Sequence, residues 1–359
     1  MNPMDLSGKR VLIVKPSSLG DVVHTLPVVH AIKRCYPSCH VGWIVQAAFQ
    51  GILEHDPSID EILPISIPST SDPHAPRGSF VRALVATLKT VRDLRTVLKH
   101  ARYDYVMDLH ASLRSGLFAM SNPDGVRVGF ADAKELNTRF QHRILTPDRA
   151  KPHAVDRNLE FARFLHCEPQ PDDFRVVSGA AARQRVRAFL DEAGISERDR
   201  VVYANPAARW ETKFWTVSGW AELGDLLIQE AAAKVVFGGS LQDRAYIESI
   251  VNMMKQPAVV AAGRLNLSEA VALIDYADVY VGVDSGPMHV AAFAGTPVVA
   301  LFGPTDPAKV GPYGDGHRVI FSGDVDCLAC RKRSCTNRRC LEKIPASKVF
   351  DETVGLLGW

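Results

Sequence analysis

The segment VKPSSLGDVVHTLPVVHAI, residues 14–32, joins an apolar run to an amphipathic stretch through a short polar turn. The run KRVLIVK (9–15) has the length and composition of a buried strand, and apolar residues after the turn recur at helical spacing. This pattern is typical of a βα unit. Asp21 follows Gly20 at the strand exit, where open α/β sheets bind ligands. The segment therefore predicts a ligand site as well as a fold.

The same alternation continues along the chain and predicts two α/β halves, with parallel sheets that face each other across a cleft. The other apolar runs expected to be strands are 40–46, 104–110, 201–206, 233–239, 257–263, 279–286 and 297–304. The clearest helical periodicities are at 80–101 and 267–277. Pro and Asp cluster around 167–186, where we expect a linker, and residues 66–79 are expected to form a mobile loop.

The composition is that of an ordinary globular protein. A chain of 359 residues favours two domains, and 47% hydrophobic with 23% charged residues is an unremarkable balance. A formal charge of +2 argues against nucleic-acid binding driven by net charge. The N-terminus lacks the apolar run of a signal peptide, and no run reaches the roughly 18 to 20 residues that a membrane span needs. We expect a cytoplasmic protein.

The segment VDSGPMH (283–289) has the features of a phosphate site. A strand gives way there to a helix whose first turn offers free backbone N–H groups, with Asp284 and Ser285 at the junction. Gly286 would let a ligand approach the backbone, and His289 follows one turn later. The alternative is purely structural: Ser285 caps the helix, Gly286 forms the turn and His289 is an ordinary helix histidine.

Five segments carry a resemblance to a known family: SSLGDVVHTLP, HAVDRNLEFA (153–162), NPAARWETKFW (205–215), FGGSLQD (237–243) and VDSGPMHVAAFAGTPVVALFGPTDP (283–307). Together they resemble the ADP-heptose–lipopolysaccharide heptosyltransferases of glycosyltransferase family 9. The resemblance implies an α/β fold of GT-B architecture, with two Rossmann-like domains. It implies an acceptor-binding domain at 1–175, an ADP-heptose-binding domain at 176–344 and a helix at 345–359 that packs back on the first domain. It also implies inverting transfer without a metal or cofactor.

The resemblance also implies roles for individual residues. Asp21 would be the general base that activates the acceptor hydroxyl, and Lys213 would bind the donor phosphates, with Arg209 as a second candidate cation. The other implied donor-binding residues are Asp243 for the heptose hydroxyls (or Gln242 if the alignment slips by one), Leu265 for adenine, Asp284, Ser285, Gly286 and His289. For Leu265, a plain core position is the alternative.

A basic run at 137–158 predicts the acceptor side. Such a run is usually a solvated face. However, the implied acceptor, Kdo-lipid A or inner-core lipopolysaccharide, carries carboxylates and phosphates that suit pairing with Arg. The acceptor-binding residues implied by the resemblance are Arg114, Arg139, His153 and Arg157. A lipid-anchored acceptor also implies a peripheral position at the inner face of the inner membrane.

Four cysteines lie close together near the C-terminus, in CLACRKRSCTNRRC (327–340). The spacing of Cys327, Cys330, Cys335 and Cys340 would suit a structural zinc held by four thiolates. Free or partly paired thiols are the alternative. The Arg and Lys residues between them could meet anionic lipid headgroups.

Several functions compete at this point. The first motif is more similar to transferases of the first heptose, onto Kdo of Kdo-lipid A, while the cysteine segment is more similar to transferases of the second. A related enzyme using another sugar nucleotide is a further alternative. A nucleotide-sugar-binding module without turnover would predict loss of Asp21, which is present. An NAD-dependent dehydrogenase would need G-x-G-x-x-G after the first strand, and KPSSLGDVV lacks it.

Overall fold

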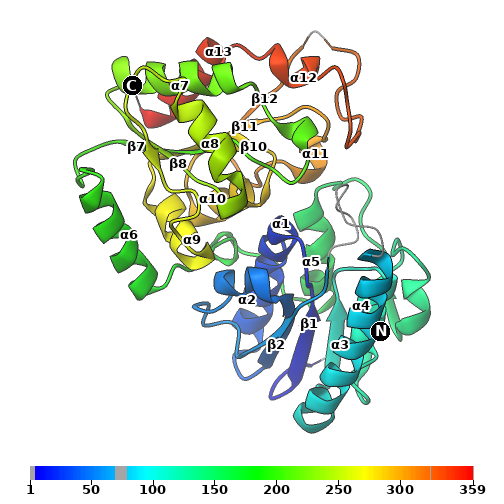
Figure 1. Cartoon of the computed structure of the whole chain (residues 1–359). Coiled ribbons are helices and arrows are strands. Elements are labelled where there is room, and N and C mark those ends of the chain that lie inside the picture. The colour runs from blue at the N-terminus through cyan, green and yellow to red at the C-terminus, as the bar shows by residue number, and fades with distance from the viewer. Residues whose placement is uncertain (1–4, 69–78, 324, 359) are drawn as a thin grey trace. The chain divides into compact units, whose positions relative to one another are not determined.

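Figure 1 shows the chain as a computed structural model, which describes residues 5–68, 79–323 and 325–358. Most of the expected loop at 66–79 therefore lies outside the described residues. The chain divides into two compact units, Met1–Arg175 and Val176–Trp359. Each unit holds one six-stranded parallel sheet covered by helices, and the two are described separately. The cleft expected between them stays a prediction.

The sheet of the first unit has the strand order β3-β2-β1-β4-β5-β6. Its strands are β1 (Arg10–Val14), β2 (His40–Gln46), β3 (Glu61–Ile65), β4 (Tyr105–Asp108), β5 (Val126–Phe130) and β6 (Arg143–Leu145). The chain builds outward from β1 to β3, then returns to add β4 on the other side of β1. In α/β sheets, this reversal creates a crevice at the carboxyl ends of the two central strands, and ligands bind there.

Both faces of the first sheet are covered, which explains the apolar runs in its central strands. Four of the five residues of β1 are fully buried, and Leu12 pairs in register with Gly42 of β2 and Val106 of β4. The helices are α1 (Leu19–Val23), α2 (Leu26–Cys35), α3 (Ser79–Ala101), α4 (Leu113–Ala119) and α5 (Ala154–Phe164). Gly42 is required by packing, because a Cβ there would lie 2.0 Å from the Tyr103 hydroxyl.

The second unit repeats the arrangement, with the order β12-β11-β10-β7-β8-β9. Its strands are β7 (Val201–Asn205), β8 (Lys234–Phe237), β9 (Val259–Val260), β10 (Val279–Val283), β11 (Val298–Leu301) and β12 (Arg318–Ile320). Its helices are α6 (Ala180–Glu192), α7 (Val217–Gln229), α8 (Arg244–Val251), α9 (Leu267–Tyr276), α10 (Gly286–Ala294), α11 (Pro307–Val310), α12 (Arg339–Glu342) and α13 (Ala346–Leu357). The crevice therefore falls between β7 and β10.

Two segments need comment. Helix α13 packs against α7 and β10 of its own unit, and the contact with the first domain expected from the sequence stays a prediction. Its apolar side, including Val349 and Leu357, is buried in the core of that unit. The expected linker at 167–186 contains the start of α6, because AAARQRV from Ala180 is rich in strong helix formers. Among the described residues, no helix is long and apolar enough to cross a membrane.

Candidate active site

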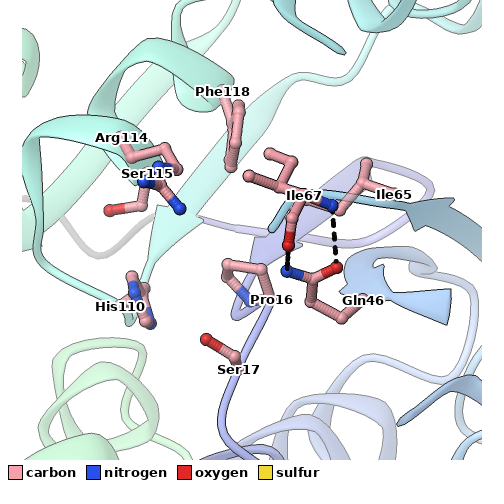
Figure 2. A pocket seen from close by; sticks show the side chains of 9 residues that line it. All are labelled: Pro16, Ser17, Gln46, Ile65, Ile67, His110, Arg114, Ser115 and Phe118. Carbon is pink, nitrogen blue, oxygen red and sulfur yellow. Dashed lines mark hydrogen bonds between the residues drawn. The ribbon is translucent and has the colours of Figure 1, made fainter. Parts of the chain in front are cut away.

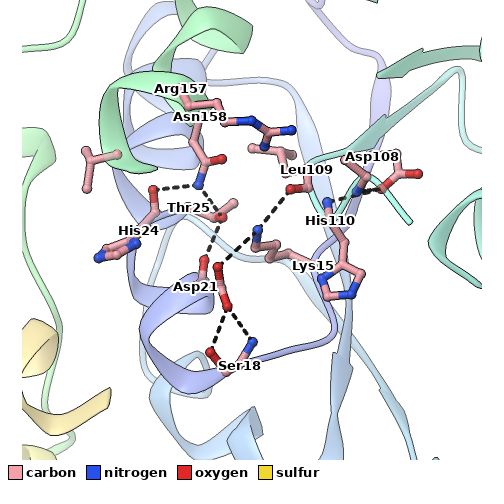
Figure 3. A network of polar contacts seen from close by, with 12 residues as sticks. Lys15, Ser18, Asp21, His24, Thr25, Asp108, Leu109, His110, Arg157 and Asn158 are labelled. Atoms are coloured by element: carbon pink, nitrogen blue, oxygen red, sulfur yellow. Dashed lines mark hydrogen bonds and ion pairs between the residues drawn. The ribbon is translucent and has the colours of Figure 1, made fainter. Parts of the chain in front are cut away.

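Asp21 and Lys15 form an ion pair at the carboxyl end of β1 (Figure 3). The Lys15 ammonium lies 3.6 Å from Asp21 Oδ1 and donates a hydrogen bond of 2.9 Å to the carbonyl of Leu109, just after β4. The pair therefore lies on the β1 side of the crevice, and the Lys15 hydrogen bond crosses it to the β4 side. The Lys15 side chain is 6% exposed and that of Asp21 is 45% exposed. The carboxylate is thus the member of the pair that a ligand can reach.

The turn into α1 fixes the Asp21 carboxylate. Its Oδ2 accepts hydrogen bonds from the Ser18 backbone N–H at 2.9 Å and from the Ser18 hydroxyl at 2.7 Å. Partial burial would raise the pKa of Asp21, but the Lys15 charge and the Ser18 hydrogen bonds together hold that pKa well below its usual range. Burial also lowers the pKa of Lys15, more than Asp21 raises it. Asp21 is therefore ionised throughout the neutral pH range.

A pocket adjoins this pair (Figure 2). It is lined by His110, which follows β4, by Arg114 on α4, and by apolar side chains that include Ile65 and Phe118. Burial and the Lys15 charge lower the pKa of His110 to about 4, so its imidazole is neutral at pH 7. The pocket combines one guanidinium, one neutral imidazole and an apolar wall. Such a lining can contact a single anionic group.

Asp108, at the end of β4, holds the residues around the pocket in place through hydrogen bonds. It is fully buried, and burial raises its pKa even though hydrogen bonds oppose the shift. Oδ1 accepts from the N–H groups of His110 at 3.1 Å and Ala111 at 3.0 Å. Oδ2 accepts from Ser115 Oγ at 2.9 Å, Asn137 Nδ2 at 2.7 Å and Gln141 Nε2 at 3.2 Å. Asp108 thereby holds the turn that carries His110 and the start of α4.

The remaining acceptor candidates do not line this pocket: Arg157 and His153 lie at helix α5, and Arg139 lies in a short 3-10 helix. Arg157 on α5 lies close enough to Lys15 to lower its pKa, and its guanidinium makes a two-point contact with Asp132, at 2.7 and 3.1 Å. The same guanidinium lies 3.7 Å above the Phe130 ring. The His153 Nδ1 accepts from the Val155 N–H at 3.1 Å and so caps α5. Arg139 lies exposed in the 3-10 helix η2 (Asn137–Phe140).

The second unit also has an ion pair at its crevice. Lys213 lies in the 3-10 helix η4 (Glu211–Lys213) after β7, and Asp284 follows β10 directly. The Lys213 ammonium is 2.6 Å from Asp284 Oδ2 and 3.2 Å from the Asp284 carbonyl oxygen. Here the lysine side chain is the more exposed member, at 16% against 6%. Asn205 at the end of β7 completes the bridge by donating to Ser285 Oγ at 3.1 Å.

Trp210 packs beside this lysine. The Lys213 ammonium lies 4.9 Å from the centre of the indole ring, and the Arg333 guanidinium lies 4.8 Å from it. Two further hydrogen bonds hold the cysteine-bearing segment against η4. Thr212 Oγ1 donates to the Lys332 carbonyl at 2.9 Å, and Arg338 donates to the Glu211 carbonyl at 3.1 Å. The segment that contains the cysteines therefore supports the turn of the candidate phosphate-binding lysine.

The four cysteines are not gathered as a metal site. Cys327, Cys330 and Cys335 are exposed, whereas Cys340 is buried in the core of the second unit. Across the described ranges of the chain, no three His, Cys, Asp or Glu side chains form a group that could hold a metal ion. Burial raises the pKa of the Cys340 thiol, and the three exposed thiols lie close enough to add to that rise.

The other donor candidates follow the carboxyl ends of neighbouring strands. Asp243, after β8, accepts from the Ser240 N–H at 2.9 Å and the Ser240 hydroxyl at 2.5 Å, and its neighbour Gln242 is exposed. Leu265, after β9, is half-buried. Gly286 begins α10, His289 is buried within that helix, and Arg209 is exposed beside η4. The predicted donor residues thus share one edge of the second sheet.

Four residues at these crevices were missing from the sequence prediction: Lys15, Asp108, His110 and Asn205. Lys15, Asp108 and Asn205 end or directly follow a buried strand, and His110 lies two residues beyond β4, so position alone was an available signal. The apolar run DYVMDLH, for example, predicts a strand up to His110, whereas β4 ends at Asp108. Their partners, however, come from the neighbouring strand of the folded sheet.

The fold and the two ion pairs define a class. Two Rossmann-like units in one chain, one presenting a carboxylate and the other a cation beside a helix N-terminus, are typical of a glycosyltransferase of GT-B architecture. The family model described as Glycosyltransferase family 9 (heptosyltransferase) matches residues 91–341. The chain belongs to this family, and the protein is a glycosyltransferase.

Named relatives agree with this assignment. The chain is 28% identical to lipopolysaccharide heptosyltransferase 1 of Pseudomonas aeruginosa, over 91% of this chain and 87% of the relative. It is also 28% identical to lipopolysaccharide heptosyltransferase 3 of Escherichia coli K12, over 94% and 95%. A glycosyltransferase family 9 structure from Veillonella parvula shares the fold, with a TM-score of 0.84, 23% identity and 99% coverage of both chains.

Proposed function

We propose that the protein transfers L-glycero-D-manno-heptose from ADP-heptose to Kdo of Kdo-lipid A, with inversion at the anomeric carbon. The observation that carries the proposal is the opposite presentation of the two ion pairs: a reachable carboxylate at β1 and β4, and a reachable ammonium at β7 and β10. The first suits a hydroxyl that must lose a proton, and the second suits a departing diphosphate. The names of the relatives supply the sugar and the class of acceptor.

Asp21 is proposed as the general base. Its low pKa keeps it ionised, so it can accept a hydrogen bond from the acceptor hydroxyl at any neutral pH. It is too weak a base to deprotonate a free hydroxyl. As the acceptor oxygen donates its lone pair to the anomeric carbon, however, the hydroxyl proton becomes strongly acidic and passes to Asp21. The carboxylate also stabilises positive charge on the sugar in an oxocarbenium-like transition state.

The leaving group is assigned to the second unit. As the anomeric carbon–oxygen bond breaks, its electron pair moves to the β-phosphate oxygen of ADP. Lys213 is placed to stabilise that charge, together with the Gly286 N–H at the turn into α10. Pro287 has no N–H, and the Met288 N–H donates to the Ser285 carbonyl at 3.2 Å. Asp284 is buried and holds the lysine in position. Asp243, Leu265 and His289 are proposed contacts of the heptose and the nucleoside.

The acceptor side is proposed to use the cations of the first unit. Arg114 lines the pocket beside Asp21, and Arg157 is held rigidly by Asp132 and Phe130. Together with Arg139 and His153 they would pair with Kdo carboxylates and lipid A phosphates. A second candidate is transfer of the second heptose, which the cysteine-bearing segment 327–340 favours. In that case the acceptor would already carry one heptose.

One assay tests these alternatives. The purified protein is incubated with ADP-heptose and, in parallel, with Kdo-lipid A, with the same acceptor carrying one heptose, and without acceptor. Products are weighed by mass spectrometry, and the new anomeric configuration is read by NMR. We expect one added heptose on Kdo-lipid A, with inverted configuration. Product from the heptosylated acceptor alone would identify the second-heptose enzyme, and retained configuration would contradict the base mechanism.

A further inference from the structure

Helix α3 of the first unit has an apolar ridge on its outward face. Val81, Leu84, Val85 and Leu88 are 61%, 52%, 62% and 59% exposed. Their spacing of three and four residues places them on one side of the helix. Single exposed apolar residues are ordinary, but a contiguous row of four branched side chains marks an interaction surface.

The same side of α3 turns basic in its second half. Arg92, Arg95 and Lys99 continue the helical spacing from Leu88, and all three are exposed. Residues 79–101 contain five Lys or Arg and one Asp, a net charge of +4. That one acid, Asp93, contacts Arg92 at 3.7 Å, where both side chains are largely exposed, so it neutralises little of the charge.

The opposite side of α3 already supplies what the fold needs. Ala83, Thr87, Leu94 and Leu98 are buried, and the two leucines pack in the core of the first unit with Leu12 of β1. The outward ridge is therefore not required to attach the helix. It makes α3 apolar on two sides, which is costly in water unless the outer side has a partner.

We propose that the outward face of α3, from Val81 to Lys99, binds the surface of an anionic lipid bilayer. The apolar half would enter the boundary between headgroups and acyl chains, and the basic half would pair with headgroup phosphates, as in interfacial amphipathic helices. Charge favours a membrane over a second copy of this chain, because a symmetric dimer would bring two helices of net charge +4 together.

The proposal rests on the proposed function, since a lipid-linked acceptor gives the enzyme a reason to sit on a bilayer. The position of α3 agrees with this role. It packs against α4, the helix that carries Arg114 of the acceptor pocket (Figure 1). Membrane binding through α3 would therefore hold the pocket near the headgroup region, where the sugar of a lipid-anchored acceptor emerges.

Vesicle sedimentation tests the surface. Wild-type protein is mixed with vesicles of phosphatidylcholine alone or with about one third phosphatidylglycerol, at low and high salt. We expect binding to the anionic vesicles that weakens with salt, and a loss of about 10-fold or more in the Leu84→Glu/Leu88→Glu variant. The matched control is Met253→Glu/Phe321→Glu, which adds the same charges at exposed apolar positions of the second unit. This control should bind like wild type.

Activity separates this proposal from the proposed function. The α3 variant should retain wild-type turnover on a de-acylated, water-soluble acceptor and lose most of its rate on acceptor embedded in vesicles. Absence of product from wild type with the soluble acceptor would contradict the proposed function alone. Equal vesicle binding by wild type and the α3 variant would overturn the membrane surface. So would a concentration-dependent dimer, seen by light scattering, that the variant abolishes.

Discussion

Each unit places a Lys–Asp ion pair at the carboxyl-end crevice of its own sheet, but the more exposed member of the pair differs between the units. In the first unit the lysine, Lys15, is buried and its partner Asp21 is reachable. In the second unit the aspartate, Asp284, is buried and its partner Lys213 is the more exposed side chain. In the proposed mechanism the buried charge holds its partner in place, and the more exposed charge would contact the ligand.

The pairs are also built differently along the chain. Lys15 follows β1 directly and Asp21 comes from the next helix, so both belong to the same side of the crevice. Lys213 lies eight residues beyond β7, and Asp284 is supplied by β10. The common element is therefore the place in the sheet rather than a repeated sequence. Four substitutions test whether this opposite presentation determines the roles.

The largest effect is expected at the reachable carboxylate. Asp21→Asn keeps the size and polarity of the side chain but cannot take a proton, so kcat should fall by about 10²-fold or more. The affinity for ADP-heptose, measured by calorimetry, should stay unchanged because the donor is assigned to the other unit. Asp172→Asn, an exposed carboxylate of the same unit, is the control. Near-normal turnover of Asp21→Asn would contradict the role of general base proposed for the exposed carboxylate of the first unit.

The second effect is expected at the reachable ammonium. Lys213→Ala should weaken binding of ADP itself by about 10- to 100-fold, the loss of a charge-assisted contact with phosphate. Lys255→Ala, an exposed lysine of the same unit, should bind ADP like wild type. Wild-type activity should also survive saturating EDTA, because Lys213 and the start of α10 carry the diphosphate charge. Activity abolished by EDTA and restored by Mg²⁺ would show that these groups do not suffice.

The buried lysine should act through the pKa of Asp21. In Lys15→Met the ammonium that lowers this pKa is absent, so the pKa rises, by about 1 to 3 units for a close opposite charge. The base works when ionised, and the acid limb of the kcat/KM profile should therefore move to higher pH. At pH 7 the loss of rate should be about 10-fold or less, since most of the carboxylate remains ionised. Lys33→Met, which breaks the Lys33–Asp60 pair at 2.7 Å, should leave the limb unmoved.

The smallest effect sharpens the assignment of the acceptor to the first unit. Arg157→Ala removes one of several cations, so the acceptor KM should rise by about 3- to 10-fold while the ADP-heptose KM stays constant. Arg163→Ala, on the same helix and paired with Glu160 at 2.7 Å, is the control. A rise in the ADP-heptose KM instead would contradict the assignment of Arg157 to the acceptor.

The sequence predicted most of the central strands, and it missed the edge strands β3, β6 and β12 together with the interior strand β5. The edge strand β9 lies within the predicted run 257–263. Strands β1, β2, β7 and β10 are continuous apolar runs because helices cover both of their faces. The edge strand β6 is only RIL, with no fully buried residue, and β12 is RVI with one. Neither has the buried run or the alternation on which a sequence prediction depends. The register of such strands is set by the neighbour to which they add.

Some residues of the candidate site could likewise be predicted from the sequence, and others could not. Asp21, Lys213 and Asp284 were predicted because each belongs to a motif at the end of a recognisable element. Their partners were not, because Lys15 reaches across to the Leu109 carbonyl and Asn205 reaches to Ser285, contacts that exist only after two distant strands pair. The spacing of the four cysteines left two readings open, a thiolate metal site or free thiols. The structure buries Cys340 and exposes the other three, a difference that spacing alone does not show.

The position of Trp210 gives the molecule an optical reporter of its own. Among the tryptophans of the described chain, Trp43, Trp215 and Trp220 are buried, whereas Trp210 is half-buried between the Lys213 and Arg333 cations. The excited state of an indole responds to charge beside its ring. A phosphate that draws the Lys213 ammonium away from the ring would therefore change the emission of this tryptophan, and occupancy of the nucleotide site could be followed in an unlabelled sample by its own fluorescence.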